Sequence, residues 1–330
     1  MKRPSQTLAQ KAMTRRVATE LPLDNQLRYG EILGFIAGDG SLGKTHNGVS
    51  FTNSDSYCIG RMLGNFSIIF GTKIADFRFY LGIPAATLPS AADEYWRTEI
   101  GAPEIKIKNY KKTKKRFGWL KADIHDKQIK ENIKSGIERI LSGEETDEAI
   151  LRGFLRGFFA AEGAIIPGKY RREIPNAVQF PQKGKQVPLR IHAILRSFGV
   201  ESRVVIKQKK ADYYCANITG FENYQKLVSL GIVDVHPEKK QRLTEGLGAY
   251  RKIVSRKLVL PIKLLKILYE EPRTRTQIYA AVDSYPQRVN GLLYSKTSYL
   301  VKNKLIQKNC SEDGTILWSV TEAGRRLAQE

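Results

Sequence analysis

The chain has 330 residues, enough for two or three compact domains, and 42% of them are hydrophobic. Its 55 lysines and arginines face 33 acidic residues, so the formal net charge is +22. Such a charge indicates a polyanionic partner, and we expect nucleic acid. The sequence has no apolar run of membrane-spanning length, and residues 1–23 are basic and polar, which predicts an N-terminal arm rather than a secretory signal. The isolated Cys58, Cys215 and Cys310 favour neither a disulfide framework nor a zinc site, so we expect an intracellular, cytoplasmic protein.

The first predicted element is a helix that ends near Gly38. Residues 30–45 read GEILGFIAGDGSLGKT, with glycines at 30, 34 and 38 and Asp39 directly after the last of them. Glycine inside a helix costs about 1 kcal/mol relative to alanine, so three glycines on one face need a compensating contact. The close approach of a second helix would supply that contact.

The same segment has a second interpretation, because residues 38–45 match the phosphate-loop pattern G-x-x-x-x-G-K-[ST]. A phosphate loop needs a strand before Gly38 and a helix after it, yet Asn47 and Gly48 form a turn signal close behind. Asp39 would also place a negative charge inside an anion cradle. We therefore favour the helix and keep ATP binding as a distant alternative.

The next elements complete a first subdomain, residues 24–142. We expect a strand at 49–55, a helix at 56–71, strands at 73–81, 94–100 and 116–124, and a helix near 127–141. The stretch 106–121 is rich in lysine and contains no acid. It suits contacts with DNA phosphates, with base stacking by Tyr110, Phe117 or Trp119; an ordinary solvated loop is the alternative.

A second subdomain, residues 143–252, repeats the first. Residues 152–165, RGFLRGFFAAEGAI, align with 29–42, YGEILGFIAGDGSL, at a constant spacing of 123 residues. Small residues recur at 153, 157 and 161, and Glu162 takes the place of Asp39. The following segments predict the same order, with strands at 178–184, 202–208 and 213–219 and helices at 187–199 and 222–231. We therefore predict an α+β fold in which two α-β-β-α-β-β-α units are related by a pseudo-twofold axis.

From residue 256 the pattern changes. Helices are expected at 261–271, 273–282 and 286–306, followed by a hairpin with an Asp-Gly turn and a short closing helix. This order predicts a winged-helix domain over 256–330, whose third helix would contact DNA through Arg288 and Lys296. Winged helices also bind proteins, so that alternative stays open.

The acids carry the predicted chemistry. If the two glycine-rich helices pack together, Asp39 and Glu162 emerge at the same end and repel each other unless cations lie between them. Oxygen ligands bind hard divalent cations such as Mg²⁺, and pairs of such ions suit phosphodiester cleavage. Otherwise the acids are exposed helix-end residues without a partner.

The segments ILGFIAGDG (32–40) and LRGFFAAEG (155–163) resemble the two name-giving motifs of the LAGLIDADG homing endonucleases, and the whole repeat resembles their monomeric two-motif type. The resemblance implies saddle-shaped antiparallel sheets on double-stranded DNA and hydrolysis of both strands with Mg²⁺ or Mn²⁺. It also implies a role in intron or intein mobility, with an intron-encoded, intein or free-standing origin left open, and no obligate protein partner. The alternative is a catalytically inactive DNA-binding transcription regulator, or an RNA splicing maturase, on the same scaffold.

Site residues follow from the same resemblance. Those expected to hold metal are Asp39 and Glu162 with the carbonyls of Gly38 and Ala161. Those expected to order the surrounding water are Asn53, Gln182 and a lysine, either Lys239 or Lys240, of which we select Lys240; the first-half counterpart is Lys121 or Lys127. Beyond Arg288 and Lys296, the expected DNA contacts are Lys106, Lys108, Lys111, Lys112, Lys114, Lys115, Arg116, Arg171, Arg172, Lys183, Lys185, Lys207 and Lys209.

Overall fold

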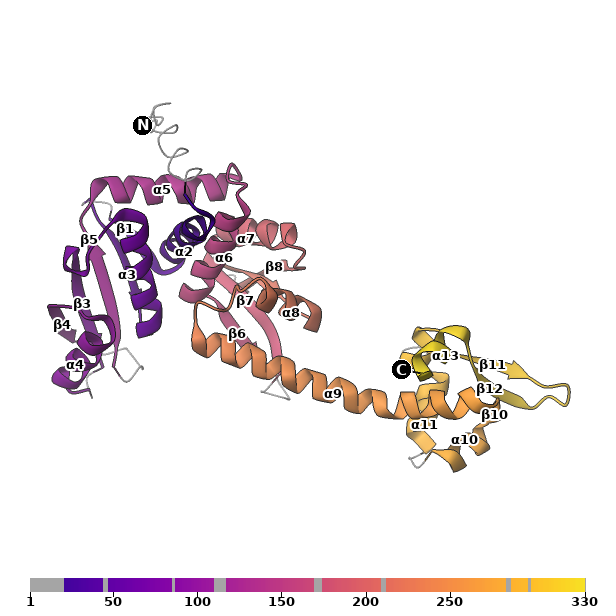
Figure 1. Ribbon diagram of the computed structural model, residues 1–330. Helices are drawn as coiled ribbons and strands as arrows, with labels where there is room; N and C mark the ends of the chain where they lie inside the picture. The colour runs from indigo at the N-terminus through magenta and orange to yellow at the C-terminus, as the bar shows by residue number, and fades with distance from the viewer. Residues whose placement is uncertain are drawn as a thin grey trace. The chain divides into compact units, whose positions relative to one another are not determined.

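The computed structural model describes residues 21–43, 47–84, 87–109, 117–168, 174–208, 212–282, 286–295 and 298–329. The chain divides into two compact units between Leu247 and Gly248, and Figure 1 shows both along the chain. The fold is mixed α+β. No helix in the described part of the chain is long and apolar enough to cross a membrane.

In its described residues, the first half of the first unit has helices and strands around a five-stranded sheet. They are α2 (Leu23–Asp39), β1 (Gly40–Leu42), β2 (Val49–Asn53), α3 (Ser56–Phe70), β3 (Phe77–Ile83), α4 (Pro89–Ile100), β4 (Ile105–Asn109), β5 (Trp119–Ile124) and α5 (Lys127–Ser142). The strands pair in the order β1-β2-β5-β3-β4. One face of this sheet is buried, because Phe51, Phe79 and Ala122 alternate with polar residues along their strands.

Two features of this half differ from the sequence prediction. Residues 94–100 belong to helix α4 and are not a strand; Ala92, Trp96 and Ile100 are buried at a spacing of four, which is a helical period that the aromatic residues obscured. Strands β3 and β4 pair in parallel. The reason is that α4 is a crossover, which returns the chain in the same direction, whereas a tight hairpin would reverse it.

The second half of the unit has the predicted element order. It consists of α6 (Glu148–Ala161), β6 (Ala164–Pro167), β7 (Pro175–Lys183), α7 (Gln186–Ser197), β8 (Arg203–Gln208), β9 (Tyr213–Ile218) and α8 (Phe221–Ser229). The four strands pair antiparallel in the order β6-β7-β9-β8. Helix α6 begins where the Asp147 side chain accepts a hydrogen bond from the amide of Ile150.

Helices α2 and α6 pack with their backbones in contact, as the glycine spacing predicts. Glycines of both helices lie so close to the opposite backbone that an added Cβ would come within 2.2 Å of a carbonyl oxygen: Gly30, Gly34, Gly153 and Gly157. Gly34 faces the carbonyl of Phe154, and Gly157 faces that of Glu31. Since Gly157 and Phe154 stand 123 residues after Gly34 and Glu31, these are one contact made twice about a pseudo-twofold axis.

A buried ion network also joins the two halves. Glu31 is 1% exposed and accepts hydrogen bonds from Arg61 at 2.8 Å, Asn65 at 2.9 Å and Arg156 of α6 at 2.7 Å. Burial opposes ionisation of Glu31, but the hydrogen bonds and charges of these arginines outweigh it and lower the carboxyl pKa. The carboxylate therefore links α2 to α3 and α6 in a single cluster.

The second unit begins within a long helix, α9 (Pro237–Glu270), which continues through Pro261. Sequence reasoning placed a helix start at that proline, because proline favours the first helical turn. The remaining elements are β10 (Arg273–Thr274), α10 (Arg275–Ala281), α11 (Pro286–Tyr294), α12 (Tyr299–Lys302), β11 (Ile306–Cys310), β12 (Ile316–Val320) and α13 (Glu322–Gln329). The predicted helix at 286–306 is thus two shorter helices. The predicted hairpin is present as β11 and β12, which form an antiparallel sheet with β10.

Candidate active site

Asp39 is the last residue of α2 and Glu162 is the C-cap of α6, so the helix pair delivers both acids to the same end. A Cβ on Gly38 would lie 3.3 Å from Cγ of Glu162, which shows how near the second acid comes to the first motif. Burial raises the pKa of the Asp39 carboxyl to about 7; the Glu162 charge adds to this shift and the Lys239 ammonium opposes it. The Asp39 residue nevertheless keeps a solvent-exposed surface, so the carboxyl remains open to a ligand.

Glu162 has a similar environment. Burial raises its pKa, while the positive charges of Lys239 and Lys207 oppose that shift. Burial raises the pKa of both carboxyl groups, and a divalent cation would offset this shift because its positive charge favours both carboxylates. The donor set therefore fits a hard cation such as Mg²⁺.

Lys239 of α9 is a cation whose charge acts on both carboxyl groups. Its Nζ donates to the carbonyl oxygens of Phe159 and Ala160, both at 2.9 Å, and lies 5.3 Å from the centre of the Phe159 ring. Burial lowers the Lys239 pKa to about 8, although neighbouring acids such as Glu162 act to raise it. The lysine thus fixes the last turn of α6, directly before the acidic residue.

The structure does not bring Lys240 to the carboxylates. Its Nζ lies 3.1 Å from Oδ1 of Asp234, and its side chain is 51% exposed. Because neighbouring residues of a helix point about 100° apart, only one of Lys239 and Lys240 can face the end of α6 that carries Glu162. Of the first-half candidates, Lys121 lies 5.7 Å from the centre of the Tyr80 ring on the sheet, and Lys127 is the exposed first residue of α5.

The two predicted amides lie at the ends of β2 and β7. Gln182 donates from Nε2 to the Ala37 carbonyl at 3.0 Å and to the Gly38 carbonyl at 3.4 Å, so a residue of the second half orients the end of α2. Asn53 of the first half lines a cavity together with Ala160 and Ala161 of the second. Each motif is therefore approached by an amide from the opposite half.

That cavity has a volume of about 380 Å³ and is the space into which the candidate site opens. It is lined by Asp39, Asn53, Ser54, Ala160, Ala161, Ala164, Ile165, His236, Glu238, Lys239 and Arg242. Sequence analysis missed His236 and Arg242. The sequence signal for them was the basic run 239–242, which contains Arg242 and follows His236 by three residues. The sequence of α9 alone does not reveal which of its faces meets the motifs.

The solvent-facing side of the five-stranded sheet is polar and basic. Strand register places Lys106 and Lys121 on either side of Tyr80, and Thr52 beside Lys121, in one row across four strands. These side chains stand opposite the buried face described above, because successive residues of a strand alternate. In the second half, Arg203, Asn217 and Gln179 form a polar row, in which the buried Asn217 accepts a hydrogen bond from Gln179. Such rows suit contacts with phosphates and base edges.

The predicted DNA-binding residues are only partly within the described structure. Lys106, Lys183, Lys185 and Lys207 are exposed, and Lys207 lies 5.9 Å from the centre of the Tyr213 ring. Lys108 and Arg288 belong to β4 and α11, but their side chains lie outside the description. The residues wholly outside it are Lys111, Lys112, Lys114, Lys115, Arg116, Arg171, Arg172, Lys209 and Lys296.

Two aromatic residues expected to stack on bases have partners inside the protein. The Phe117 ring stacks on Tyr95 with centroids 4.3 Å apart, and the Trp119 indole covers Gly82, where an added Cβ would be 2.3 Å from the ring. They stabilise the fold around β3 and β5. Tyr110, the third candidate, lies outside the described residues.

The phosphate-loop alternative lacks its structural context. Helix α2 runs from Leu23 to Asp39, so Gly38 lies in the last turn of a helix, whereas a phosphate loop begins after a strand. The segment that follows Asp39 is strand β1, paired antiparallel with β2. The glycine-rich segment is therefore a helix-packing face that ends in an acid.

Two curated proteins are similar to part of this chain. Both are tRNA-splicing ligases RtcB, from Methanopyrus kandleri and Pyrococcus furiosus, with 30% identity over 142 residues and 28% over 173 residues. The matches include 41% and 48% of this chain but only 14% and 17% of the ligases. The chain therefore spans a small part of these relatives.

Solved structures with a similar arrangement include the homing endonuclease I-DmoI, also in complex with DNA and Mn, and full-length DUF199/WhiA from Thermotoga maritima. I-DmoI with DNA and Mn matches at 13% identity and a TM-score of 0.40, over 62% of this chain and 97% of the endonuclease. DUF199/WhiA matches at 13% identity and a TM-score of 0.42, over 91% of this chain and 88% of its own. A model of the LAGLIDADG-like domain family matches residues 149–230, which run from α6 into the residue after α8. The second half of the first unit is therefore similar to the LAGLIDADG-like domain family.

Proposed function

We propose that this protein is a site-specific DNA endonuclease that hydrolyses phosphodiesters of both strands with Mg²⁺ or Mn²⁺. The observation that carries the proposal is the meeting of Asp39 and Glu162 at one end of two helices in backbone contact, with Lys239 beside them. The charge of +22 and the basic rows on the sheets support duplex DNA as the substrate. An enzyme of this kind would act inside the cell, where its DNA is.

Asp39 and Glu162 would hold the divalent cations, with the Gly38 and Ala161 carbonyls as further oxygen ligands. When bound, such a cation lowers the pKa of water and neutralises charge on the scissile phosphate. Gln182 orients the carbonyls before Asp39, and Lys239 orients those before Glu162, so both acids project from fixed helix ends. The Lys239 pKa of about 8 allows this side chain to exchange a proton with solvent near neutral pH.

Incubation with a library of duplex DNA targets tests the proposal. We expect cleavage with Mg²⁺ by the wild type, a loss of at least 100-fold in Asp39→Asn and Glu162→Gln, and unchanged DNA affinity in both variants. Glu222→Gln, an exposed acid at the start of α8, is the matched control and should cut normally. Tight binding without cleavage by the wild type would instead favour a catalytically silent DNA-binding regulator. Binding of single-stranded RNA in preference to duplex DNA would favour a splicing cofactor.

A further inference from the structure

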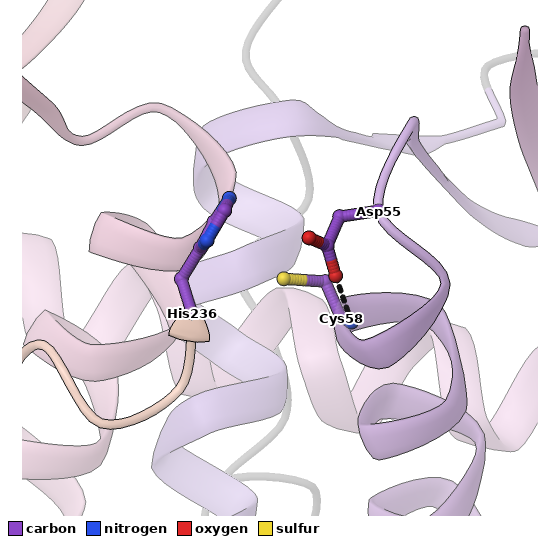
Figure 2. Close-up of side chains that lie close together, drawn as sticks. All are labelled: Asp55, Cys58 and His236. Carbon is purple, nitrogen blue, oxygen red and sulfur yellow. Dashed lines mark hydrogen bonds between the residues drawn. The ribbon is translucent and has the colours of Figure 1, made fainter. Parts of the chain in front are cut away.

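Three potential metal ligands converge beside the candidate carboxylate pair, and one of them, His236, also lines the cavity. The Cys58 sulfur, a carboxylate oxygen of Asp55 and a ring nitrogen of His236 all lie within 4.8 Å of one another. Figure 2 shows the Cys58 sulfur and the Asp55 carboxylate facing the His236 ring. Cys58 is 2% exposed and His236 is 8% exposed, while Asp55 is half-buried.

We infer that Asp55, Cys58 and His236 form a Zn²⁺ site that joins the two halves of the first unit. Thiolate, imidazole and carboxylate are the ligand types that Zn²⁺ combines in proteins, whereas Mg²⁺ prefers oxygen alone. Zinc–ligand bonds of about 2.0–2.3 Å at tetrahedral angles separate ligand atoms by roughly 3.3–3.8 Å. Side-chain rotation would bring the three atoms from their present spacing to that geometry, leaving one position for water.

The local structure orients these ligands. Asp55 is the N-cap of α3, and its Oδ1 accepts a hydrogen bond from the Cys58 amide at 3.0 Å, which fixes the two residues one helical turn apart. His236 directly precedes α9, and its neighbour Val235 accepts a weak hydrogen bond from the Cys58 thiol at 3.6 Å. Two ligands thus come from the first half and the third from the second.

The charges also suit a divalent ion. A Cys58 thiolate and an Asp55 carboxylate would together balance the charge of Zn²⁺, with His236 as a neutral ligand. Without a metal, burial and the Asp55 charge raise the pKa of the Cys58 thiol, which keeps it protonated. Zinc binding should therefore displace the thiol proton to solvent.

The position gives the ion a structural role. Asn53, which lines the cavity, accepts a hydrogen bond from the Asp55 amide at 2.9 Å, and Lys239 follows His236 by three residues. An ion held by Asp55 and His236 would therefore restrain the positions of Asn53 and Lys239, which both line the cavity. The Zn²⁺ ion would be a structural ion that crosslinks the two halves of the first unit, and it would be separate from the cations at Asp39 and Glu162.

Cobalt and zinc binding by the full chain tests this inference, and neither readout depends on DNA cleavage. Metal-free wild type should bind Co²⁺ at this site with a thiolate-to-cobalt charge-transfer band, and Zn²⁺ should displace that ion. Cys58→Ser should abolish the band and His236→Asn should weaken Zn²⁺ binding at least tenfold, whereas Cys215→Ser, a buried cysteine of β9, should bind as the wild type does. Asp39→Asn should also keep the band, which separates this site from the carboxylate pair.

The absence of a thiolate band in the wild type would overturn the inference, as would unchanged Zn²⁺ affinity in Cys58→Ser. The competing account is that Cys58 is an ordinary core cysteine whose thiol meets the Val235 carbonyl, and it predicts both of these results. Zn²⁺ should also raise the melting temperature of the wild type and of Cys215→Ser by more than that of His236→Asn. If Cys58→Ser fails to fold, the cobalt spectrum of the wild type and the affinity of His236→Asn decide the question.

Discussion

The Nζ of Lys239 lies 2.9 Å from the carbonyl oxygen of Ala160, two residues before Glu162, and so ties the start of α9 to the end of α6. The same nitrogen holds the Phe159 carbonyl at 2.9 Å. Gln182 provides the corresponding restraint at the end of α2 through the Ala37 carbonyl, which stands 123 residues before that of Ala160. The two motifs are therefore fixed at equivalent carbonyls by side chains of different charge.

The first prediction concerns this lysine. Lys239→Met should reduce the DNA cleavage rate by about 100-fold or more, because the carbonyls before Glu162 lose their donor and the site loses a positive charge. Lys240→Met is the matched control, since Lys240 pairs with Asp234 on the surface, and it should change the rate less than about threefold. Single-turnover cleavage with saturating Mg²⁺ measures both. Equal losses in the two variants would contradict the assignment.

The raised pKa of Asp39 predicts how stability depends on pH without metal. This pKa is about 7 in the folded protein and about 3.9 in an unfolded chain, so the folded state binds more protons between these values. The free energy of unfolding should therefore fall as pH rises from about 4 to 7. Above pH 7 the destabilisation by the ionised Asp39 carboxylate should stay constant. Asp39→Asn removes this contribution.

Urea unfolding in EDTA at pH 5 and pH 8 measures that effect. On going from pH 5 to pH 8, the midpoint for Asp39→Asn should rise relative to the midpoint for the wild type. Glu222→Gln should follow the wild type at both values. If the urea midpoints of Asp39→Asn and the wild type differed by the same amount at pH 5 and pH 8, the Asp39 carboxyl would have an ordinary pKa.

Metal affinity should depend on pH for the same reason. A cation that binds the Asp39 carboxylate must displace its proton below pH 7, so Mn²⁺ affinity should rise by about tenfold per pH unit between pH 5 and pH 6 and level off above pH 7. Isothermal titration at several pH values in buffers of different ionisation enthalpy would measure the released proton. A flat profile from pH 5 to pH 8 would exclude Asp39 as a ligand with a raised pKa.

The helix contact gives a prediction about stability. Gly34→Ala would place a Cβ 2.0 Å from the Phe154 carbonyl oxygen, so the helices must separate and the protein should lose about 3 kcal/mol or more. Gly64→Ala is the control, because this glycine lies in α3 with no atom within 4 Å of an added Cβ, and it should gain about 0.5–1 kcal/mol. Chemical denaturation measures both. A stable Gly34→Ala protein would contradict the backbone contact.

The buried Glu31 network gives a second stability prediction. Glu31→Ala leaves Arg156, whose side chain is 12% exposed, without its carboxylate, and should cost about 3–5 kcal/mol. Glu322→Ala removes an exposed partner of Arg326 and should change stability by less than about 0.5 kcal/mol. If the two substitutions had equal effects, the Glu31 cluster would not be a significant link between the halves.

The sequence predicted the helix pair and its acids because glycine spacing and an internal repeat are local signals. It could not choose between Lys239 and Lys240, since that choice depends on how α9 is rotated against the end of α6. The strand expected at 94–100 was wrong because Tyr95 and Trp96 favour strands, while their burial pattern belongs to a helix. The grouping of Cys58 with His236 was also unpredictable, because its members come from opposite halves of the repeat.

The paired contacts of Gly34 with Phe154 and of Gly157 with Glu31 have a consequence for symmetry. They are the two members of an isologous contact, the kind that a homodimer makes across its twofold axis. A homodimer would have to carry the same residue at both facing positions, but here one is the ion-paired Glu31 and the other is Phe154, which packs against Phe158. Because the two halves belong to one chain, they can carry different residues at equivalent positions. The DNA target of the proposed endonuclease would therefore not need to be palindromic, whereas a symmetric dimer imposes palindromy on its target.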